Sequence, residues 1–187
     1  MAVLDLVIAP NQLLRSPCEP VTSFSKQLHT FLDNMFESML AHHGIGLAAP
    51  QVGVLQQVAV IDISSDYIEQ PRITSKEVDP ASSHTHQERL ELINPKIVTG
   101  SKKVSSEEGC LSIPDYRDTI TRSDTITVEA LDRHGRHFSF EATELLAFAV
   151  QHEVDHLNGI LFVDHLSRLK KTLFKKWAIK NLGSGEI

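Results

Sequence analysis

The sequence has few cysteines and no long hydrophobic run. Only Cys18 and Cys110 occur among its 187 residues, which argues against a disulfide framework and makes a reducing cytoplasm the expected location. No segment approaches the roughly 20 apolar residues of a transmembrane helix. Residues 1–10 carry Asp5 and lack the basic segment of a signal peptide. The net charge of −6 argues against nucleic-acid binding by the whole molecule. We therefore expect neither DNA nor a membrane as a partner.

What the chain does contain is enough apolar sequence for one folded domain. Hydrophobic residues make up 41% of it, and residues 1–187 are predicted to form a single domain with a buried core. The basic residues are unevenly spread, because six of the 18 lie in a segment without any acidic residue: Arg168, Lys170, Lys171, Lys175, Lys176 and Lys180. This segment is predicted to form a separate, electropositive surface.

Three helices are predicted from hydrophobic spacing. Residues 25–42 carry apolar side chains three and four positions apart, and Gly44 is placed to end that helix. A second helix is predicted over 143–158, with Thr143 as its N-cap. A third, basic helix is predicted over 167–181, with Leu166, Leu169, Leu173 and Trp177 on one stripe. The stretch 44–53 is too rich in small and helix-breaking residues to be a helix.

Strands are predicted over 58–63, 90–98, 126–131 and 137–140. Pro95 confines the second of these to a sheet edge or a bulge, and His134-Gly135 supplies a hairpin turn before the last. Residues 64–89 are rich in Ser, Pro, Thr and charge, and are predicted to form a long exposed loop. The order of these elements indicates an α+β domain with a mostly antiparallel sheet.

The segment 151–156 reads Gln-His-Glu-Val-Asp-His and carries the clearest chemical signal. On a helix, residues four apart share a face, so His152 and His156 can bind one metal ion. Glu153 lies next to the first ligand, where its carboxylate can accept a proton from a metal-bound water. This arrangement is typical of metal-assisted hydrolysis.

A catalytic site of this kind needs a third protein ligand. Phe162 stands where the metzincin pattern requires His, which excludes that family, and the only later Glu is Glu186 in the tail. His165 is one candidate downstream, and Cys110 is another upstream. Cys110 could instead be a small buried hydrophobic residue, or a nucleophile paired with His152.

Three separated segments together resemble the signature motifs of bacterial peptide deformylases. They are GIGLAAPQ at 44–51, EGCLS at 108–112 and QHEVDH at 151–156. Their order and spacing agree with that family, and the resemblance runs from the N-terminus to about Leu166. It implies an α+β fold with mostly antiparallel sheets packed around a central metal-binding helix, plus an N-terminal and a C-terminal helix. The 64–89 loop is longer than the usual connection in the family.

The resemblance also implies a reaction and a set of roles. Cys110, His152 and His156 would hold one divalent metal ion, iron(II) in the physiological enzyme, with zinc, nickel or cobalt as substitutes. Glu153 would take a proton from the metal-bound water and pass it to the departing amine. Gln51, through its side-chain amide, and Leu111, through its backbone N–H, would donate to the oxyanion. The reaction is removal of formyl from the N-terminal formyl-methionine of new proteins, releasing formate.

Substrate contacts follow from the same positions. The methionine side chain would occupy a pocket lined by Ile45, Leu145, Phe148 and Ala149. Gly46 and Gly109 would offer backbone groups to an extended peptide. Arg117 matches a family position near the peptide path, although a surface salt bridge explains it equally well.

Two questions stay open at the level of sequence. The lysines of the C-terminal helix either face water while Leu169, Leu173 and Trp177 pack on the body, or contact ribosomal RNA during nascent-chain processing. A metallopeptidase cutting internal amide bonds, or a non-catalytic binding module for protein N-termini, would also use a metal site. The general base Glu153 argues against the binding module, because a structural site needs no base.

Overall fold

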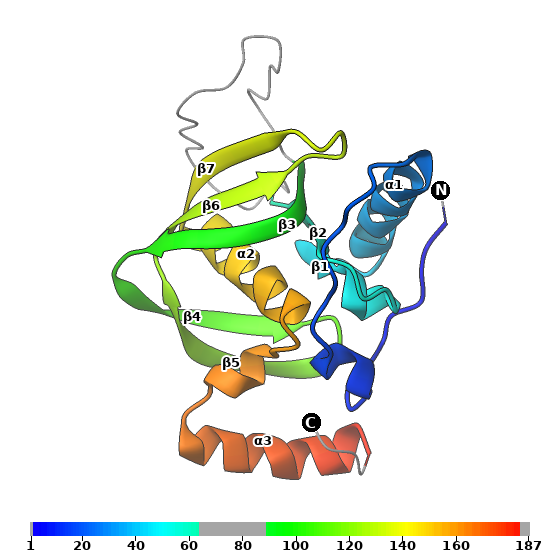
Figure 1. The fold of residues 1–187 in the computed structure, drawn as a ribbon. Helices are drawn as coiled ribbons and strands as arrows, with labels where there is room; N and C mark the ends of the chain where they lie inside the picture. Colours follow the sequence, from blue (N-terminus) through cyan, green and yellow to red (C-terminus); the bar gives the residue numbers. More distant parts are fainter. Residues whose placement is uncertain (1, 64–88, 184–187) are drawn as a thin grey trace.

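The computed structural model describes residues 2–63 and 89–183 and confirms the α+β class (Figure 1). Its helices are α1 (Lys26–Ala41), α2 (Glu144–Leu157) and α3 (Arg168–Asn181), joined by the short 3-10 turns η1 (Gln12–Arg15), η2 (Ala49–Val52) and η3 (Phe162–His165). The strands are β1 (Gly46–Ala48), β2 (Val58–Asp62), β3 (Arg89–Gly100), β4 (Lys103–Cys110), β5 (Ile113–Ser123), β6 (Thr125–Leu131) and β7 (His137–Thr143). A five-stranded sheet has the order β1-β2-β3-β6-β7, and β4 pairs with β5 separately; every pair is antiparallel.

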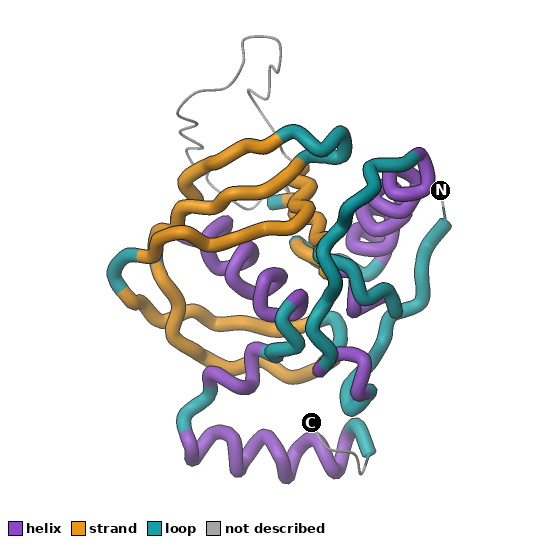
Figure 2. Tube along the Cα trace, in the orientation of Figure 1, coloured by secondary structure: helices purple, strands orange, loops and turns teal. Residues whose placement is uncertain are grey.

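Helix α2 lies in the middle of the molecule, between the five-stranded sheet and the β4–β5 ribbon (Figures 1 and 2). Eight of its 14 residues are buried, whereas a helix on the surface buries only one stripe. Its apolar residues Leu146, Ala147 and Val150 join a core formed with the inner faces of β2, β3, β6 and β7. Thr143 occupies the predicted N-cap position, but its side chain makes no capping hydrogen bond. The expected central helix is therefore present.

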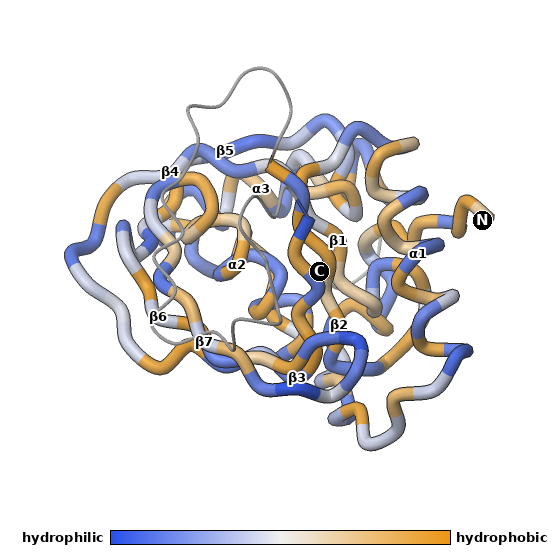
Figure 3. Tube along the Cα trace, turned by 90° about the horizontal axis from the view of Figure 1, so that it is seen from above, coloured by the Kyte–Doolittle hydropathy of each residue, from blue (hydrophilic) through white to orange (hydrophobic). Residues whose placement is uncertain are grey.

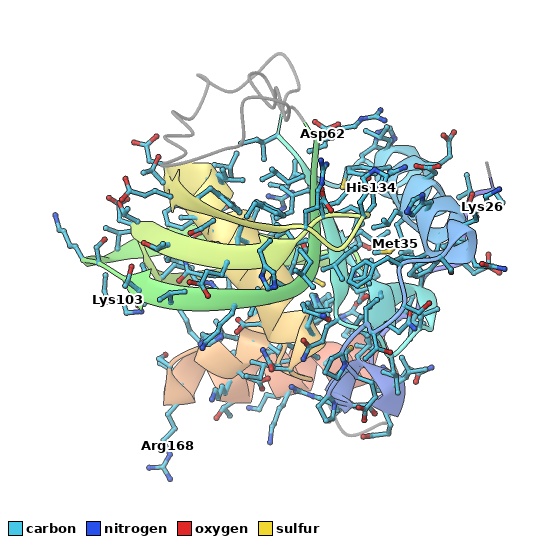
Figure 4. All side chains as sticks on the ribbon, turned by 45° about the horizontal axis from the view of Figure 1, so that its top comes forward. Lys26, Met35, Asp62, Lys103, His134 and Arg168 are labelled. Atoms are coloured by element: carbon cyan, nitrogen blue, oxygen red, sulfur yellow. The ribbon has the colours of Figure 1, made fainter. Side chains whose placement is uncertain are left out.

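Helix α1 covers β1 and β2 on the other side. The Ser25 hydroxyl caps it by accepting from the backbone N–H of Leu28. Met35, which Figure 4 labels, is fully buried and packs with the strand residues Leu47 and Val60. Along α1 the tube in Figure 3 alternates between hydrophobic and hydrophilic colours, as an amphipathic helix requires.

The end of α1 differs from the sequence-based expectation. Its C-cap is His42, and His43 rather than Gly44 adopts the left-handed conformation, with φ of 57°. Gly44 instead leaves room for a neighbouring side chain, since a Cβ there would lie 2.8 Å from Leu111 Cδ1. The breaker-rich stretch that follows holds the short strand β1 and the turn η2.

The strands agree with the sequence in part. The predicted bulge at Pro95 is confirmed by the register shift between Ile93 and Lys96 on β3, where Asn94 has φ of 51°. The β4–β5 ribbon was not predicted as strands. Residues 64–88 of the predicted loop lie outside the described residues, and Arg89 begins β3.

Helix α3 forms where it was predicted, with Ser167 as N-cap, but it packs on a different face. Leu169 and Leu173 are 72% and 55% exposed, whereas Phe174 and Ala178 are buried. The expectation that both leucines dock on the body is therefore wrong. Leu166 is buried, but it lies before the helix, at the end of η3.

The packing of α3 is set by β5. The Tyr116 ring lies 4.7 Å from that of Phe174 and 4.8 Å from that of Trp177. Lys170 Nζ donates to Asp118 Oδ1 at 2.5 Å. Together, the aromatic cluster and the ion pair fix the rotation of the helix.

Two expectations based on composition can also be checked. Cys18 and Cys110 are both free, and burial raises the pKa of the Cys18 thiol to about 11. Within 2–63 and 89–183, none of the helices combines the length and apolar character needed to cross a bilayer.

Candidate metal centre

The three predicted ligands meet in the structure, on α2 and at the end of β4. The ligand atoms of Cys110, His152 and His156 all lie within 4.8 Å of one another. His156 Nε2 is 3.2 Å from Cys110 Sγ, and the two imidazole centroids are 5.0 Å apart. The alternative ligand His165 does not join the cluster, because its Nε2 lies 2.7 Å from Asp155 Oδ2.

The ring of His152 is held by Glu108 on β4. Glu108 Oε2 lies 2.9 Å from His152 Nδ1, and both of its oxygens accept from Arg122, at 2.8 and 3.0 Å. Burial acts to raise the pKa of Glu108, but the hydrogen bonds from His152 and Arg122 outweigh it and lower the pKa to about 2. An ionised Glu108 can only accept, so His152 donates from Nδ1, and Nε2 is the nitrogen that would hold a metal ion.

The two buried imidazoles differ in basicity. Burial acts to lower the pKa of His152, but Cys110 and Glu108 raise it well above the usual value. Burial, followed by the charge of His152, lowers the pKa of His156. His156 is therefore the neutral imidazole of the pair, with a lone pair available to a cation.

Glu153 is buried, 4% exposed, and its Oε2 has no hydrogen-bond partner within the described residues. Burial raises the pKa of this carboxyl to about 7, against the lowering effect of His152. The side chain occupies space that Gly46 leaves free, because a Cβ on residue 46 would lie 2.3 Å from Glu153 Oε1. Such a carboxyl can accept and return a proton near neutral pH.

Gln51, 1% exposed on η2, points its amide group into the centre. Its Oε1 accepts from the backbone N–H of Ala48 at 2.8 Å, which fixes the two ends of the amide. Its Nε2 therefore faces Ser112 Oγ at 3.3 Å and Cys110 Sγ at 3.5 Å. This places a neutral N–H donor beside the ligands.

The residues present fit a divalent metal ion. A thiol and two imidazoles are ligands that zinc and iron share, and three ligands leave a coordination position for water. A carboxylate behind one ligating imidazole is the usual support in metal sites. The buried Glu153 carboxyl beside the cluster is the further group that hydrolysis needs.

A pocket of about 900 Å³ opens onto this centre. Every residue predicted to contact substrate lines it: Ile45, Gly46, Gly109, Arg117, Leu145, Phe148 and Ala149. Gln51, Leu111 and Glu153 line the same pocket, as do Cys110 and His152. Sequence reasoning missed the supporting roles of Glu108, Arg122 and Ser112. The alternation of Ser106, Glu108 and Cys110 is the signal that would place Glu108 and Cys110 on one strand face.

By fold and site, the chain has the features of a metal-dependent hydrolase with a peptide-sized pocket. The family model for polypeptide deformylase matches residues 3–172. A peptide deformylase from Hydrogenovibrio crunogenus is 44% identical over 172 residues, covering 92% of this chain and 90% of that protein. The chain belongs to the polypeptide deformylase family.

Solved structures agree with this assignment. A peptide deformylase from Legionella pneumophila is 37% identical, with a TM-score of 0.79 and full coverage of both chains. A Met-Ala-Ser-bound class I type b peptide deformylase from Acinetobacter baumannii is 31% identical, with a TM-score of 0.74, covering 88% of this chain and 99% of that one. The family removes the N-formyl group from new polypeptides, so the metallopeptidase and binding-module alternatives are set aside.

Proposed function

We propose that this chain hydrolyses the formamide of N-terminal formyl-methionine at a metal ion held by Cys110, His152 and His156, with Glu153 as general base and acid. The observation that carries the proposal is that three ligand atoms within 4.8 Å adjoin the buried Glu153 carboxyl, whose Oε2 has no hydrogen-bond partner in the part of the chain that the structure describes. We infer that Cys110 is a ligand rather than a nucleophile, because a Cys110–His152 nucleophile pair would leave His156, 3.2 Å from the Cys110 sulfur, and the buried Glu153 without a role.

Iron(II) is the proposed physiological metal, with zinc, nickel or cobalt able to replace it. Once bound, such an ion lowers the pKa of a coordinated water and polarises the formyl carbonyl. Glu108 supports this centre by fixing the His152 ring and raising its basicity as a ligand. Elemental analysis after anaerobic purification would identify the ion.

Glu153 is proposed to carry the proton from the attacking water to the departing amine. Its carboxyl has a pKa of about 7, so it can accept a proton and release it at neutral pH. No hydrogen bond within the described residues competes for Oε2, so this oxygen is available to the water.

Gln51 and Leu111 are proposed to stabilise the negative charge that develops on the formyl oxygen. The Gln51 amide is fixed through Ala48, so its Nε2 is pre-positioned as a donor. The backbone N–H of Leu111 would supply the second hydrogen bond. Each such donor typically contributes about 10²–10³-fold in rate.

The apolar part of the pocket is proposed to receive the methionine side chain, between Ile45 and the α2 residues Leu145, Phe148 and Ala149. Gly46 on β1 and Gly109 on β4 then lie beside the peptide as strand-edge positions, with Arg117 further along the path. A relative is described as Met-Ala-Ser-bound, and that peptide corresponds to a deformylated N-terminus, which supports a peptide with an N-terminal methionine as the ligand.

Formate release from formyl-Met-Ala-Ser tests the proposal directly. Glu153→Ala should retain one metal ion per chain yet lose formate release, because it removes the base and spares the ligands. Cys110→Ala should lose the metal itself. Full activity of the Glu153→Ala enzyme would contradict the assigned role of Glu153.

A transient contact with the ribosome through α3, in the cytoplasm, is the second part of the proposal. Lys171, Lys175 and Lys176 are exposed on α3, and Arg168 projects from its start (Figure 4). The exposed Leu169 and Leu173 add apolar area to the same helix. Neutralising the three lysines should weaken ribosome binding in a salt-dependent assay without changing turnover of free formyl-peptide. Unchanged ribosome binding would exclude this contact.

A further inference from the structure

His165 belongs to a hydrogen-bond network of side chains that ends at His152, a proposed metal ligand. His165 Nε2 lies 2.7 Å from Asp155 Oδ2, which also accepts from Arg122 Nη1 at 2.6 Å. Arg122 donates through Nε and Nη2 to the two oxygens of Glu108. Glu108 then accepts from His152 Nδ1. Five side chains thus run from the surface to the centre.

The side chains of this network become less exposed towards its middle. The side chain of His165 is 35% exposed and that of Asp155 is 17% exposed, whereas those of Arg122 and Glu108 are 4% and 8% exposed. A buried guanidinium shared by two carboxylates needs partners at both ends, because loss of one leaves charge uncompensated. A carboxylate can only accept, so the 2.7 Å contact with Asp155 requires a proton on His165 Nε2, which then has no lone pair for Arg122 Nη1 at 3.4 Å. His165 therefore donates to Asp155.

The turn η3 reaches the metal ligand by a second route. Phe162, at the start of η3, stacks on the His152 ring, with centroids 6.0 Å apart and planes at 29°. His165 ends the same turn. The turn therefore contacts the face of the His152 ring directly, and contacts its Nδ1 edge through Asp155, Arg122 and Glu108.

We propose that His165 is a positioning residue that acts through Asp155 and Arg122 on Glu108, and so fixes His152 for metal binding. This inference rests on the proposed role of His152 as a ligand. When His165 donates, Asp155 Oδ2 is held in place, and Arg122 is anchored at one end. Its other two donors then keep Glu108 aligned with His152 Nδ1. Without His165, Arg122 is the one side chain among the described residues that still holds Asp155 Oδ2.

The test is metal affinity, measured by competition of zinc-loaded enzyme with a chromophoric chelator. Loss of a group that directly supports a ligand typically costs about 10–100-fold in affinity, which sets the expectation for Glu108→Gln. His165 lies three side chains further out than Glu108, and His165→Ala should cost about three- to tenfold in affinity. His165→Gln, which keeps a donor for Asp155, should restore most of that loss. The NMR resonance of the His152 Nδ1 proton should shift in His165→Ala and return in His165→Gln.

The matched control is Asp164→Asn. Asp164 adjoins His165 in η3 and is ion-paired with Arg15, which does not belong to the hydrogen-bond network. This variant should loosen the turn yet leave zinc affinity unchanged. Wild-type affinity in His165→Ala, no recovery in His165→Gln, or an equal loss in Asp164→Asn would each overturn the proposal. Failure of the wild type to bind metal would instead refute the proposed function, so the two failures are distinguishable.

Discussion

Replacing Gly46 by Ala should displace the general base without removing the metal. The new Cβ would lie 2.3 Å from Glu153 Oε1, 2.9 Å from Cδ and 3.1 Å from Cγ. Ordinary contact begins near 3.4 Å, so the carboxyl oxygen must withdraw by about 1 Å. A misplacement of about 1 Å at a reacting group can cost about 10²-fold in rate. We therefore expect kcat to fall about 100-fold while one metal ion per chain remains bound.

Formate release and elemental analysis measure these two quantities. Gly135→Ala is the control for backbone strain, because Gly135 has φ of 79° in the β6–β7 turn, away from the centre. It should lower stability by about 1 kcal/mol and leave kcat unchanged.

Gly46 also lies beside the proposed peptide path, so its two effects must be separated. In a Glu153→Ala background the clashing atoms are gone, and Gly46→Ala should then leave Met-Ala-Ser binding unchanged. Weaker binding in the double variant, measured by calorimetry, would show that the methyl group obstructs the peptide. An unchanged kcat in the single variant would refute the steric reasoning itself.

Three further outcomes are expected. Gln51→Leu should reduce kcat about 10²–10³-fold with the metal retained, as measured by formate release and elemental analysis. In urea unfolding, Phe174→Ala should cost about 3–5 kcal/mol because its ring is buried, while the exposed Leu173→Ser should stay within about 0.5 kcal/mol. Burial acts to raise the pKa of Asp164, but Arg15 holds it below the usual value. Their pairing should therefore stabilise the fold above about pH 4 and be lost as pH falls further, and unfolding curves of Asp164→Asn should lack this dependence.

The sequence predicted the local part of the centre and missed much of what surrounds it. His152 and His156 are four residues apart on one helix, with Glu153 directly after the first, so their proximity can be predicted without knowledge of the tertiary structure. Cys110 lies on another element, so its own neighbours left three interpretations open until the family resemblance favoured one. The structure brings its sulfur beside His156 because β4 ends there. Hydrophobic periodicity describes single elements, so it cannot predict a contact between residues of two elements far apart in the sequence.

Glu108 and Arg122 show the same limit. The β4–β5 ribbon is rich in Ser, Thr and charged residues, and much of it is exposed, so it lacks the apolar alternation of a half-buried strand. Without that ribbon there was no reason to place Arg122 beside Glu108 or either of them behind His152. Their burial is compensated by the pairing of the two charges and by their further contacts with Asp155 and His152.

Helix α3 was predicted at the correct residues, but the face that packs on the body was predicted wrongly. Its apolar residues form two stripes, one that contains Leu169 and Leu173 and one that contains Phe174 and Ala178. Neighbouring residues of a helix are about 100° apart around its axis, so the two stripes face different directions. Periodicity allows either stripe to pack. The choice is made by Tyr116 on the unpredicted strand β5, which contacts Phe174. Because the leucines then share the outer surface with lysines, binding of a partner there should combine a salt-sensitive component with an apolar one that salt does not screen.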